Sequence, residues 1–443
     1  MIAAVSSARR WGIIGLLFTA SLINYLDRAT LAVALPAIGR DLALGPALKG
    51  ILLFSFFWSY AAMQIPIGWF ADRANLRWLY TGLFALWSLP CGLTGFAGSF
   101  AAVVALRVLL GVGESIYLAG GTKIVAAFFG PTERGLPSGL FDSGSRAGLA
   151  VGTPLVALLI VRYGWRRMFF LVGFSALLWL IPWLRIFPSG FTRTSATPEP
   201  RTSRTEASAP RLDRNLLGIC LGFFCFGYYW FLLVTWLPDY LVEVRHRSIL
   251  RAGAYASLPY LIFGVCMPLG GWIADLLIRS GWDETRARKG VLTVAFLCGL
   301  MLIPAVRVAN PRTALAVVCA SSMVGLATGN MMAIVQGCSP PARLGFWTGC
   351  ENFAGNLGGV LSPIATGFLI AHPGSYFPGF GIAVLVLLAG LLCYWIVVGE
   401  LKPTERQAEP WFNVPPAAAG DGVGDGSSVL RRSGHTRHNA GTT

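Results

Sequence analysis

Charged side chains occur inside two of the most apolar segments of this sequence. The first segment reads Asn-Tyr-Leu-Asp-Arg at 24–28 and places Asp27 directly before Arg28. The second contains Arg107 and Glu114, whose seven-residue spacing is nearly two helical turns, so they share one helix face about 10 Å apart. A charge among apolar side chains is costly and rarely lacks a role, so these four residues are the first candidates for a functional site.

The four residue types suit two tasks. A guanidinium stays charged and presents a planar fork that matches a carboxylate, so Arg28 and Arg107 are predicted to bind a small organic anion. Carboxyl groups in the same surroundings can exchange protons with water, so Asp27 and Glu114 are candidates for proton coupling. The alternative is that Asp27–Arg28 and Arg107–Glu114 are ion pairs with a structural role only.

Further polar side chains lie in later apolar segments. Asp142 and Arg146 are four residues apart, with Ser145 between them, and are predicted either to neutralise each other or to contact the solute. Glu351 and Asn352 are neighbours in another segment, and the amide of Asn352 suits hydrogen bonds to solute hydroxyls. All five are predicted substrate-binding residues.

Two tyrosines are candidates to line the same site. Tyr25 belongs to the 24–28 motif, and Tyr60 is one helical turn from Gln64. Aromatic side chains in membrane helices more often serve packing or interface anchoring, which is the alternative for Tyr60.

A separate motif, Gly-x-x-x-Asp-Arg-x-Asn-x-Arg, covers residues 68–77 at the end of an apolar segment. Its small residue, acid and bases predict a latch between helices that stabilises one conformation. Asn75 can adopt the left-handed backbone conformation that Gly would take. The predicted latch residues are Gly68, Asp72, Arg73 and Arg77.

These candidates belong to a chain with the composition of a membrane protein. Its 443 residues are 55% hydrophobic and 12% charged, with a mean hydropathy of +0.63, whereas soluble domains carry about 25% charged residues. Apolar windows of about 18 residues or more recur, each long enough to cross about 30 Å of hydrocarbon. The sequence therefore predicts an all-α membrane protein and not a soluble enzyme.

Twelve transmembrane helices are predicted from hydropathy and from Gly, Pro and charge breaks. They form two six-helix halves, 1–188 and 215–400, joined by a cytoplasmic linker at 189–214 and followed by a cytoplasmic tail at 401–443. The linker is rich in Ser, Thr, Pro and Arg, and the tail is rich in Pro, Gly and Ser, so both are predicted to be disordered. The spans are predicted near 11–38, 48–70, 78–98, 101–128, 136–161, 166–187, 215–238, 252–278, 290–308, 313–337, 344–371 and 376–398.

The two halves carry matching motifs. Gly-Trp-Phe-Ala-Asp at 68–72 matches Gly-Trp-Ile-Ala-Asp at 271–275, which adds Asp275 to the predicted latch. Two pseudo-symmetric halves with a solute site between them near the midplane are the plan of one class of secondary transporters. Four further matches share one offset: Pro131 with Pro340, Arg134 with Arg343, Asp142 with Glu351, and Pro154 with Pro363.

Positive charge is unevenly distributed between the predicted loops. With both termini placed in the cytoplasm, cytoplasmic segments hold 21 of the 35 Lys and Arg residues and outer loops hold 10. This bias follows the positive-inside rule, so the net charge of +15 does not call for a nucleic-acid partner. The chain is predicted to be a multi-pass protein of a bacterial inner membrane.

No cofactor or metal site is predicted. The nine cysteines occur singly in apolar stretches and the four histidines lack metal-ligand spacing, so we expect neither a zinc site nor a disulfide framework. The sequence lacks the motifs of serine hydrolases, zinc proteases and phosphate-binding loops, which argues against the alternative of a membrane enzyme.

In these motifs the chain resembles the major facilitator superfamily and, more narrowly, its anion:cation symporter family. That family includes bacterial sugar-acid, tartrate and phthalate transporters, sialin and the vesicular glutamate transporters. Asn75 replaces the Gly of the superfamily loop between spans 2 and 3. The resemblance covers roughly residues 15–400, and its motifs lie at 24–28, 56–69, 107–114, 133–135, 236–241, 287–289 and 352–359.

The resemblance implies the superfamily's fold of twelve helices in two halves, with Asp27 and Glu114 as the coupling carboxylates. We therefore expect proton-coupled uptake of a small organic carboxylate, such as a sugar acid, a tartrate-like acid or an aromatic acid. The protein is expected to work by alternating access, as a monomer in the lipid bilayer, driven by the proton gradient without a cofactor. The residues implied at the anion site are Tyr25, Arg28, Tyr60, Arg107 and Asn352.

Departures from the family pattern leave the identity of the acid open. The galactonate-type transporters that this chain resembles have Gln where Ser145 stands and a Trp near the position of Met332. The charges of Asp142, Arg146 and Glu351 are not expected in that pattern. The alternatives to symport are a proton-driven efflux pump and an anion exchanger, and the arginine-rich core argues against export of cationic drugs.

Overall fold

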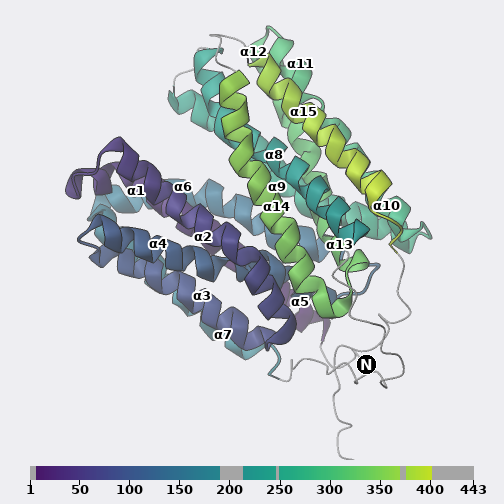
Figure 1. Ribbon diagram of the computed structural model, residues 1–443, viewed down its shortest axis with the longest axis horizontal. Helices are drawn as coiled ribbons and strands as arrows, with labels where there is room; N and C mark the ends of the chain where they lie inside the picture. The colour runs from purple at the N-terminus through teal and green to yellow at the C-terminus, as the bar shows by residue number, and fades with distance from the viewer. Residues whose placement is uncertain (1–5, 190–212, 246–248, 370–375, 402–443) are drawn as a thin grey trace, which may run out of the picture.

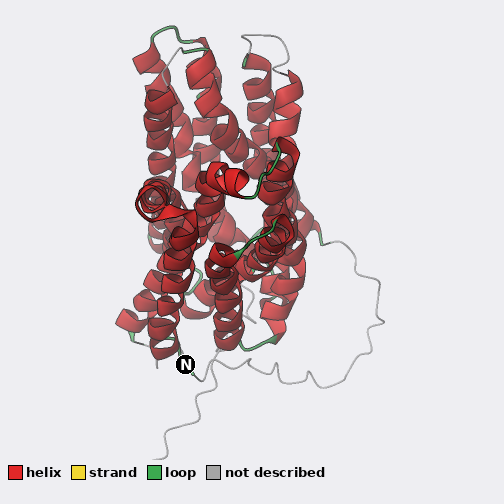
Figure 2. Cartoon of the chain, turned by 90° about the vertical axis from the view of Figure 1, so that its left-hand side faces the viewer, coloured by secondary structure: helices red, strands yellow, loops and turns green. Residues whose placement is uncertain are grey.

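The computed structural model describes residues 6–189, 213–245, 249–369 and 376–401. Within these ranges the chain is helical and contains no strand (Figure 2). Most of the predicted linker, 190–212, and nearly all of the predicted tail, 402–443, lie outside the described residues.

The first set of helices accounts for the first six predicted spans, and we call it the N-half. Three of its helices, α1, α3 and α4, begin at polar caps; for example, the Ser99 hydroxyl accepts the N–H of Ala102 at 3.3 Å. The elements are α1 (Ser7–Asp41), α2 (Pro46–Arg73), α3 (Leu76–Leu93), η2 (Thr94–Phe96), α4 (Phe100–Glu114), α5 (Ile116–Phe128), α6 (Gly135–Ala176), η3 (Leu177–Trp179) and α7 (Leu180–Ile186).

The second set, which we call the C-half, accounts for the other six. Its third span begins at Glu284 and not near 290, because the Asp283 carboxylate caps the helix by accepting the N–H of Arg286 at 3.0 Å. The elements are α8 (Arg214–Glu243), α9 (Ile249–Arg279), α10 (Glu284–Gly299), α11 (Leu302–Arg307), α12 (Pro311–Ser321), η4 (Ser322–Ala327), α13 (Thr328–Cys338), η5 (Pro341–Arg343), α14 (Leu344–Leu369), α15 (Phe377–Leu392) and η6 (Cys393–Val397).

Nine helical segments of the described ranges are long and apolar enough to cross a membrane. One of them, Gly135–Ile186, has 52 residues and as a single helix would extend about 78 Å, far beyond a bilayer. Its chain reverses at Gly164, where φ is +81°. Before the reversal, Gly144 packs against Phe18 of α1, so this part of α6 lies along α1.

After the reversal the chain runs back along α1 in the opposite direction. The Trp165 indole donates to the Asp41 carboxylate at 2.7 Å, and the Trp179 indole donates to the carbonyl of Leu16 at 2.9 Å. This segment therefore forms two spans. With α1 and α14, which have 35 and 26 residues and carry the polar groups of the site, the described helices account for all twelve predicted spans.

Glycines set the close helix packing within each half. Gly148 of α6 lies against the backbone of Leu22 in α1, and Gly358 of α14 lies against Phe224 in α8. These are equivalent parallel helix pairs in the two halves. Each half also has its own cluster of buried apolar side chains.

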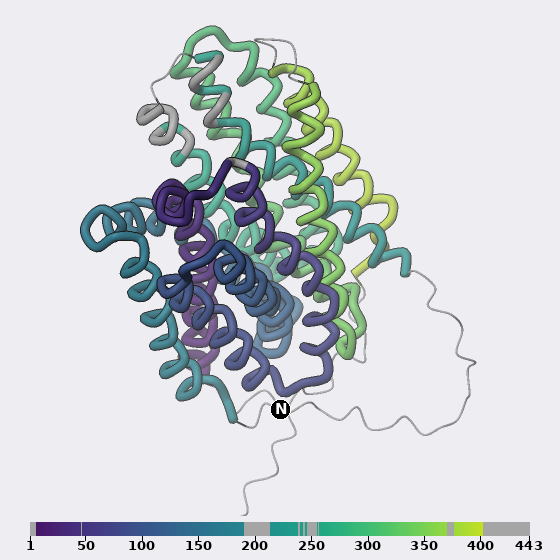
Figure 3. The backbone as a smooth tube through the Cα atoms, turned by 60° about the vertical axis from the view of Figure 1, so that its left-hand side comes forward, coloured from purple at the N-terminus to yellow at the C-terminus, as the bar shows by residue number. Residues whose placement is uncertain are grey.

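The two halves lie side by side and meet along two helix pairs, α2 with α14 and α6 with α9 (Figures 1 and 3). We call the end at which α7 stops and α8 starts the linker end. Figure 1 shows the halves close together near this end and diverging toward the opposite end, which we call the far end. Large apolar side chains such as Val161 and Phe368 are more than four-fifths exposed on the outside, as a lipid-facing surface requires.

Candidate functional site

An ion pair between α1 and α4 forms the centre of the candidate site. Arg28 Nε donates to Glu114 Oε2 at 3.0 Å, and the Glu114 side chain is fully buried. The guanidinium is also bordered by three rings, because its central carbon lies 4.5 Å from the centroids of Tyr25 and Tyr60 and 5.1 Å from that of Phe56. An arginine held in this way is positioned to accept a carboxylate if Glu114 gives up the pair.

Packing around α4 brings Glu114 to this position. Gly111 lies against Ser59 of α2, and Gly113 lies against the backbone of Trp87 in α3. A side chain at either glycine would meet these neighbours, so α4 fits between α2 and α3 only with glycine there. Its acidic end is thereby directed toward α1.

The ion pair lies next to the boundary between the two halves. Asn352 Nδ2 of α14 donates to the Tyr60 hydroxyl at 3.1 Å and to Gln64 Oε1 at 2.9 Å, both on α2. Asn356, one turn further along α14, donates to the Asn352 carbonyl at 2.7 Å. The predicted residues Tyr25, Arg28, Tyr60, Glu114 and Asn352 are therefore brought together across the boundary.

Asp27 and Arg107 lie deeper inside the N-half. One Asp27 oxygen accepts the thiol of Cys91 at 3.4 Å, and the other has no hydrogen-bond partner among the described residues. Arg107 donates to Thr30 at 3.2 Å, and its guanidinium lies over the ring of Phe169 at 5.6 Å. Both side chains are buried, so they are arranged as an interior charge layer behind Arg28.

Neither of the two ion pairs considered from sequence is present among the described residues within 4 Å. Asp27 and Arg28 are successive helix residues, whose side chains leave the axis about 100° apart, so they face different neighbours. Glu114 is held by Arg28 and not by Arg107. The pairing across α1 and α4 links the interior layer to the boundary.

Asp142 and Arg146 separate instead of forming the i,i+4 pair. The Tyr117 hydroxyl donates to Asp142, while Ser21 donates to that same hydroxyl at 3.0 Å. Asp142 thus faces α5 and α1, inside the N-half. Arg146 Nη1 donates to Ser145 Oγ at 3.1 Å, and the guanidinium does not point toward Asp142.

The Arg146 guanidinium lies against the C-half. Its central carbon is 4.1 Å from the ring centroid of Trp230 on α8, 4.9 Å from that of Phe263 on α9 and 5.7 Å from that of Tyr25. Sequence reasoning missed Trp230 and Phe263, because an aromatic residue in an apolar span carries no signal that separates packing from binding. Their position beside a guanidinium is visible only in the folded chain.

Glu351 does not lie with its neighbour Asn352. It is fully buried inside the C-half, close to Tyr394 of η6 and Cys220 of α8, and both carboxyl oxygens lack a hydrogen-bond partner among the described residues. The structure therefore places this predicted substrate-binding residue away from the Arg28 ion pair.

The two aspartates of the predicted latch make equivalent contacts between the halves. Asp72, at the end of α2, accepts the N–H groups of Gly345 and Phe346, each at 2.8 Å, at the start of α14. Its carboxylate also pairs with Lys123 at 2.8 Å. A carboxylate at a helix N-terminus satisfies otherwise unpaired N–H groups and the helix dipole.

Asp275, at the end of α9, repeats this arrangement. It accepts the N–H groups of Gly135 and Leu136 at 3.1 and 2.8 Å, at the start of α6, and pairs with Arg288 at 3.2 Å. Arg288 also donates to the carbonyl of Pro131 at 2.6 Å. Both contacts lie at the linker end and hold the halves together there.

Backbone contacts between glycines accompany both aspartates. Gly68 meets the backbone of Gly345, and Gly271 meets the backbone of Gly135, so a Cβ at Gly68 or Gly271 would overlap a carbonyl of the facing helix. The predicted role of Gly68 as the small residue of the latch thus has a direct steric reason.

The basic residues of the predicted latch make contacts inside the N-half. Arg73 lies over its own-helix neighbour Trp69 at 3.8 Å, and Arg77 donates to the carbonyl of Leu184 at 2.6 Å. Asn75 does not use the left-handed conformation that is open to it. Its φ is −67°, because it acts as the N-cap of α3, where its side chain accepts the N–H of Arg77 at 3.0 Å.

The basic side chain before α6 lies close to the Asp275 contact. Burial lowers the pKa of Arg134 to about 10, and the nearby carboxylate of Glu284 opposes this shift. Arg134 therefore remains positively charged near neutral pH. It adds a second cation to the linker-end contact that Arg288 makes.

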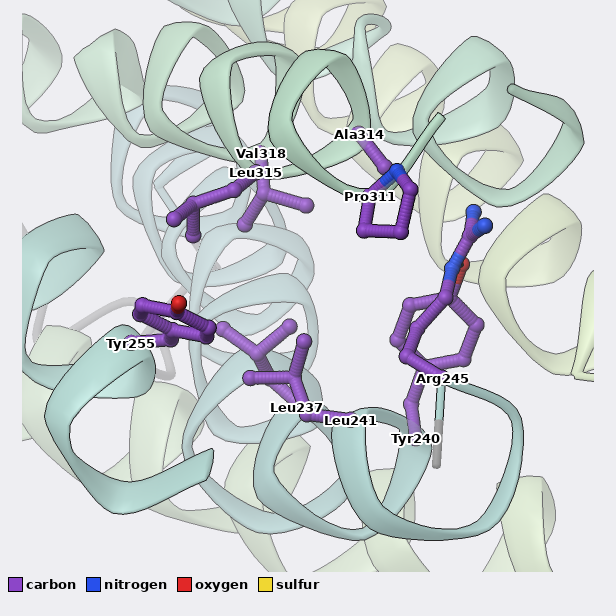
Figure 4. A pocket seen from close by; sticks show the side chains of 9 residues that line it. All are labelled: Leu237, Tyr240, Leu241, Arg245, Tyr255, Pro311, Ala314, Leu315 and Val318. Carbon is purple, nitrogen blue, oxygen red and sulfur yellow. The ribbon is translucent and has the colours of Figure 1, made fainter. Parts of the chain in front are cut away.

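A small apolar pocket in the C-half is separate from this site (Figure 4). It lies between α8, α9 and α12, on the far-end side of the C-half. Its one guanidinium, that of Arg245, is held by Tyr240 and by the carbonyls of Ala305 and Val308, so it is not free to bind an anion. The lining residues are Leu237, Tyr240, Leu241, Arg245, Tyr255, Pro311, Ala314, Leu315 and Val318.

Comparison with known proteins identifies the family. Residues 17–338 match the model of the Major Facilitator Superfamily. Since this match covers most of the chain, the chain belongs to the Major Facilitator Superfamily. It is accordingly an integral membrane transporter and not an enzyme, as the sequence predicted.

Relatives of known or assigned function match almost end to end. The D-galactonate transporter of Escherichia coli O6:H1 is 29% identical over 90% of this chain and 98% of its own. The probable galactarate/D-glucarate transporter GarP of Escherichia coli K12 is 29% identical over 90% and 96%. The hexuronate transporter of Bacillus subtilis 168 is 28% identical over 89% and 96%.

Solved structures share the fold. The transporter FucP, in its outward conformation, superposes with a TM-score of 0.67 at 13% identity, over 86% of this chain and 97% of FucP. The human organic anion transporter MFSD10 superposes with a TM-score of 0.67 at 16% identity, over 87% and 99%. These comparisons confirm the predicted all-α fold of two helical halves.

Proposed function

We propose that this protein is a proton-coupled symporter that takes up a small organic carboxylate, of the sugar-acid class, by alternating access. The relatives named above transport, or are assigned to transport, galactonate, galactarate, glucarate and hexuronates. The observation that carries the proposal is the buried Arg28–Glu114 ion pair beside the Tyr60–Asn352 contact.

The pair supplies a direct coupling between proton and cargo. When Glu114 takes up a proton, it no longer competes for the guanidinium of Arg28, and a substrate carboxylate can replace it. The proton and the anion therefore favour each other's binding, and by linkage the effect is reciprocal. Asp27 and Arg107, behind this pair, are proposed to pass or hold the proton.

Binding at the boundary then acts on both halves. The substrate replaces or joins contacts that Asn352 makes with Tyr60 and Gln64, and its hydroxyls suit these amide and phenol groups. In the closed linker-end arrangement described above, substrate enters from the far end. Opening of the Asp72 and Asp275 contacts releases it at the linker end, which we assign to the cytoplasm of a bacterial cell.

The test is transport by purified protein in proteoliposomes. The wild-type protein is expected to accumulate D-galactonate or galactarate when the lumen is more alkaline than the outside, and substrate Kd should rise about tenfold per pH unit where Glu114 loses its proton. Glu114→Gln mimics the protonated state. It is expected to keep binding and counterflow, to lose accumulation driven by the pH gradient, and to show a Kd that no longer depends on pH.

Two variants complete the test. Glu133→Gln, which removes a carboxylate paired with Arg10 near the surface, is the matched control and should behave as the wild type. Arg28→Gln should abolish binding of every acid. The proposal is wrong if Arg28→Gln binds normally, or if Glu114→Gln still accumulates substrate against its gradient.

A further inference from the structure

The guanidinium of Arg146 is buried and forms no ion pair with a carboxylate of the described residues. Among the described residues no carboxylate oxygen lies within 4 Å of it, and Nε has no hydrogen-bond partner. The residue is only 7% exposed. Asp142, the acid one turn away, accepts the Tyr117 hydroxyl and interacts with Arg146 only from beyond 4 Å.

Three rings compensate this charge only in part. Trp230, Phe263 and Tyr25 face the guanidinium from α8, α9 and α1. A cation–π contact stabilises a buried cation but is weaker than pairing with an anion. Since the rings also remove the water that would otherwise solvate it, the guanidinium of Arg146 is prepared to receive an anion.

Arg146 and Arg28 share one neighbour, the ring of Tyr25. Their central carbons lie 5.7 and 4.5 Å from its centroid, so the two guanidiniums are at most about 10 Å apart. In the part of the chain that the structure describes, Arg28 Nη2 also lacks a hydrogen-bond partner. Two cations therefore lie around one aromatic ring at the boundary between the halves.

From this arrangement we infer that the transported acid is a linear dicarboxylate, whose second carboxylate binds Arg146 while the first binds Arg28. The inference rests on the proposed function, because it extends the same anion site. Two carboxyl groups joined by about two to four hydroxylated carbons can reach both guanidiniums, each as a bidentate pair. A monocarboxylate leaves one buried cation unpaired, and a site built for a polar group rejects a ligand that lacks it.

The aromatic contacts also connect this second subsite to the transport cycle. Arg146 belongs to α6, whereas Trp230 and Phe263 belong to the C-half, and Gly264 of α9 leaves room for the Arg146 side chain to pass. A carboxylate bound to Arg146 therefore touches both halves. The dicarboxylate would span the boundary from α1 to α8.

The test compares a diacid with a monoacid of the same carbon chain. Binding of galactarate and of D-galactonate to the purified wild-type protein is measured by calorimetry and by quenching of tryptophan fluorescence, and a second pair, tartrate and threonate, covers shorter chains. The wild type is expected to bind the diacid of at least one pair about tenfold or more tightly than its monoacid.

Substitution of Arg146 separates a binding role from a structural one. Arg146→Gln is expected to raise the Kd of the diacid about tenfold or more, while the Kd of the monoacid changes less than about threefold. Arg146→Lys keeps the charge but not the planar fork, so it should recover part of the selectivity. Arg162→Gln, an exposed arginine beside Tyr163, is the matched control and should leave both constants unchanged.

The outcomes distinguish this inference from the proposed function. Equal affinity for diacid and monoacid in the wild type, or an Arg146→Gln effect that is equal for both acids or absent, would overturn the dicarboxylate subsite while the symporter proposal stands. Failure of the wild type to bind any of the four acids would overturn the substrate class and the subsite together. Thermal unfolding of each variant shows whether a loss of binding comes from loss of the fold. If Arg146→Gln is unfolded, the diacid selectivity of Arg146→Lys decides whether the subsite exists.

Discussion

Arg28 is held by one carboxylate and three rings, and this combination makes its pairing exchangeable. The rings supply part of the stabilisation of the cation whichever anion is present. Glu114 can then leave the pair without exposing the guanidinium to an entirely apolar environment. Arg146 is also bordered by three rings, one of which, Tyr25, it shares with Arg28, but among the described residues it has no carboxylate within 4 Å.

Neighbouring residues on α14 should differ sharply in their effects. Asn352 bridges to α2 with two hydrogen bonds, whereas Glu351 lies in the C-half interior near Tyr394. Asn352→Ala is expected to raise the substrate Kd about tenfold, because it removes a hydrogen-bonding group at the boundary. Glu351→Gln keeps the shape of a buried side chain that has no cation partner among the described residues, so it should leave uptake within about twofold.

Initial rates of uptake and substrate Kd in proteoliposomes check this pair of variants. Loss of uptake in Glu351→Gln with normal thermal stability would contradict the placement of Glu351 outside the substrate path, and would restore the role predicted from sequence.

The charged residues of the site could be identified from the sequence, but the ion pairs between them could not. Charges in apolar spans identified Arg28, Glu114 and Arg146 as candidates, since such charges are rarely without function. Which acid meets which base depends on helix rotation and on neighbours distant in the chain, so the Arg28–Glu114 pair was not predictable from spacing. Trp230 and Phe263 carried no signal, because apolar residues in membrane spans are expected everywhere.

Helix boundaries were better determined than helix contacts. The hydropathy and turn residues located the spans to within a few residues, because burial of backbone polar groups forces a helix across the bilayer. The largest shift, at α10, has a local cause in the Asp283 cap. Asn75 could have taken the left-handed conformation, but it lies at φ −67° because its side chain caps α3.

At the level of the helices, Asp72 and Asp275 should control the closure of the linker end. Each accepts two N–H groups from the first turn of a helix in the other half, and a hydrogen bond to a charged group contributes about 1.5–3 kcal/mol. The double substitution to Asn removes the charges and leaves Lys123 and Arg288 without these ion pairs. The fraction of molecules in which the halves are separated at the linker end is expected to rise at least about tenfold.

Electron spin resonance distances between labels at Trp78 on α3 and Arg286 on α10 would measure this shift, because both positions are at the linker end of opposite halves. Asp283→Asn is the control, since that carboxylate caps α10 within the C-half. An unchanged distance distribution in the double variant would show that other contacts keep the linker end closed.

For the whole molecule, the proposal places the linker end in the cytoplasm. The positive charges near that end favour this orientation, because Lys and Arg are retained on the cytoplasmic side during insertion. Ser189 is at the linker end and Arg162 is near the reversal at Gly164, and both are exposed. The two positions should therefore lie on opposite sides of the membrane.

A membrane-impermeant maleimide tests the orientation in intact cells. Arg162→Cys is expected to be labelled without permeabilisation, and Ser189→Cys only after it. The unsubstituted chain sets the background, since all nine native cysteines are buried or only partly exposed. The reverse labelling pattern would invert the assignment and would turn proposed uptake into export.

The glycine pairs at the linker end serve the conformational change that transport of any substrate requires, whereas other residues determine which substrate is bound. At Gly68 with Gly345, and at Gly271 with Gly135, main chain touches main chain, so there is no side chain that a second substitution could shorten to make room. Engineering for a new substrate should therefore leave these four positions alone and vary Ser145 and Arg146. Substitutions at Ser145 and Arg146 should change which acid is bound without altering these backbone contacts at the linker end.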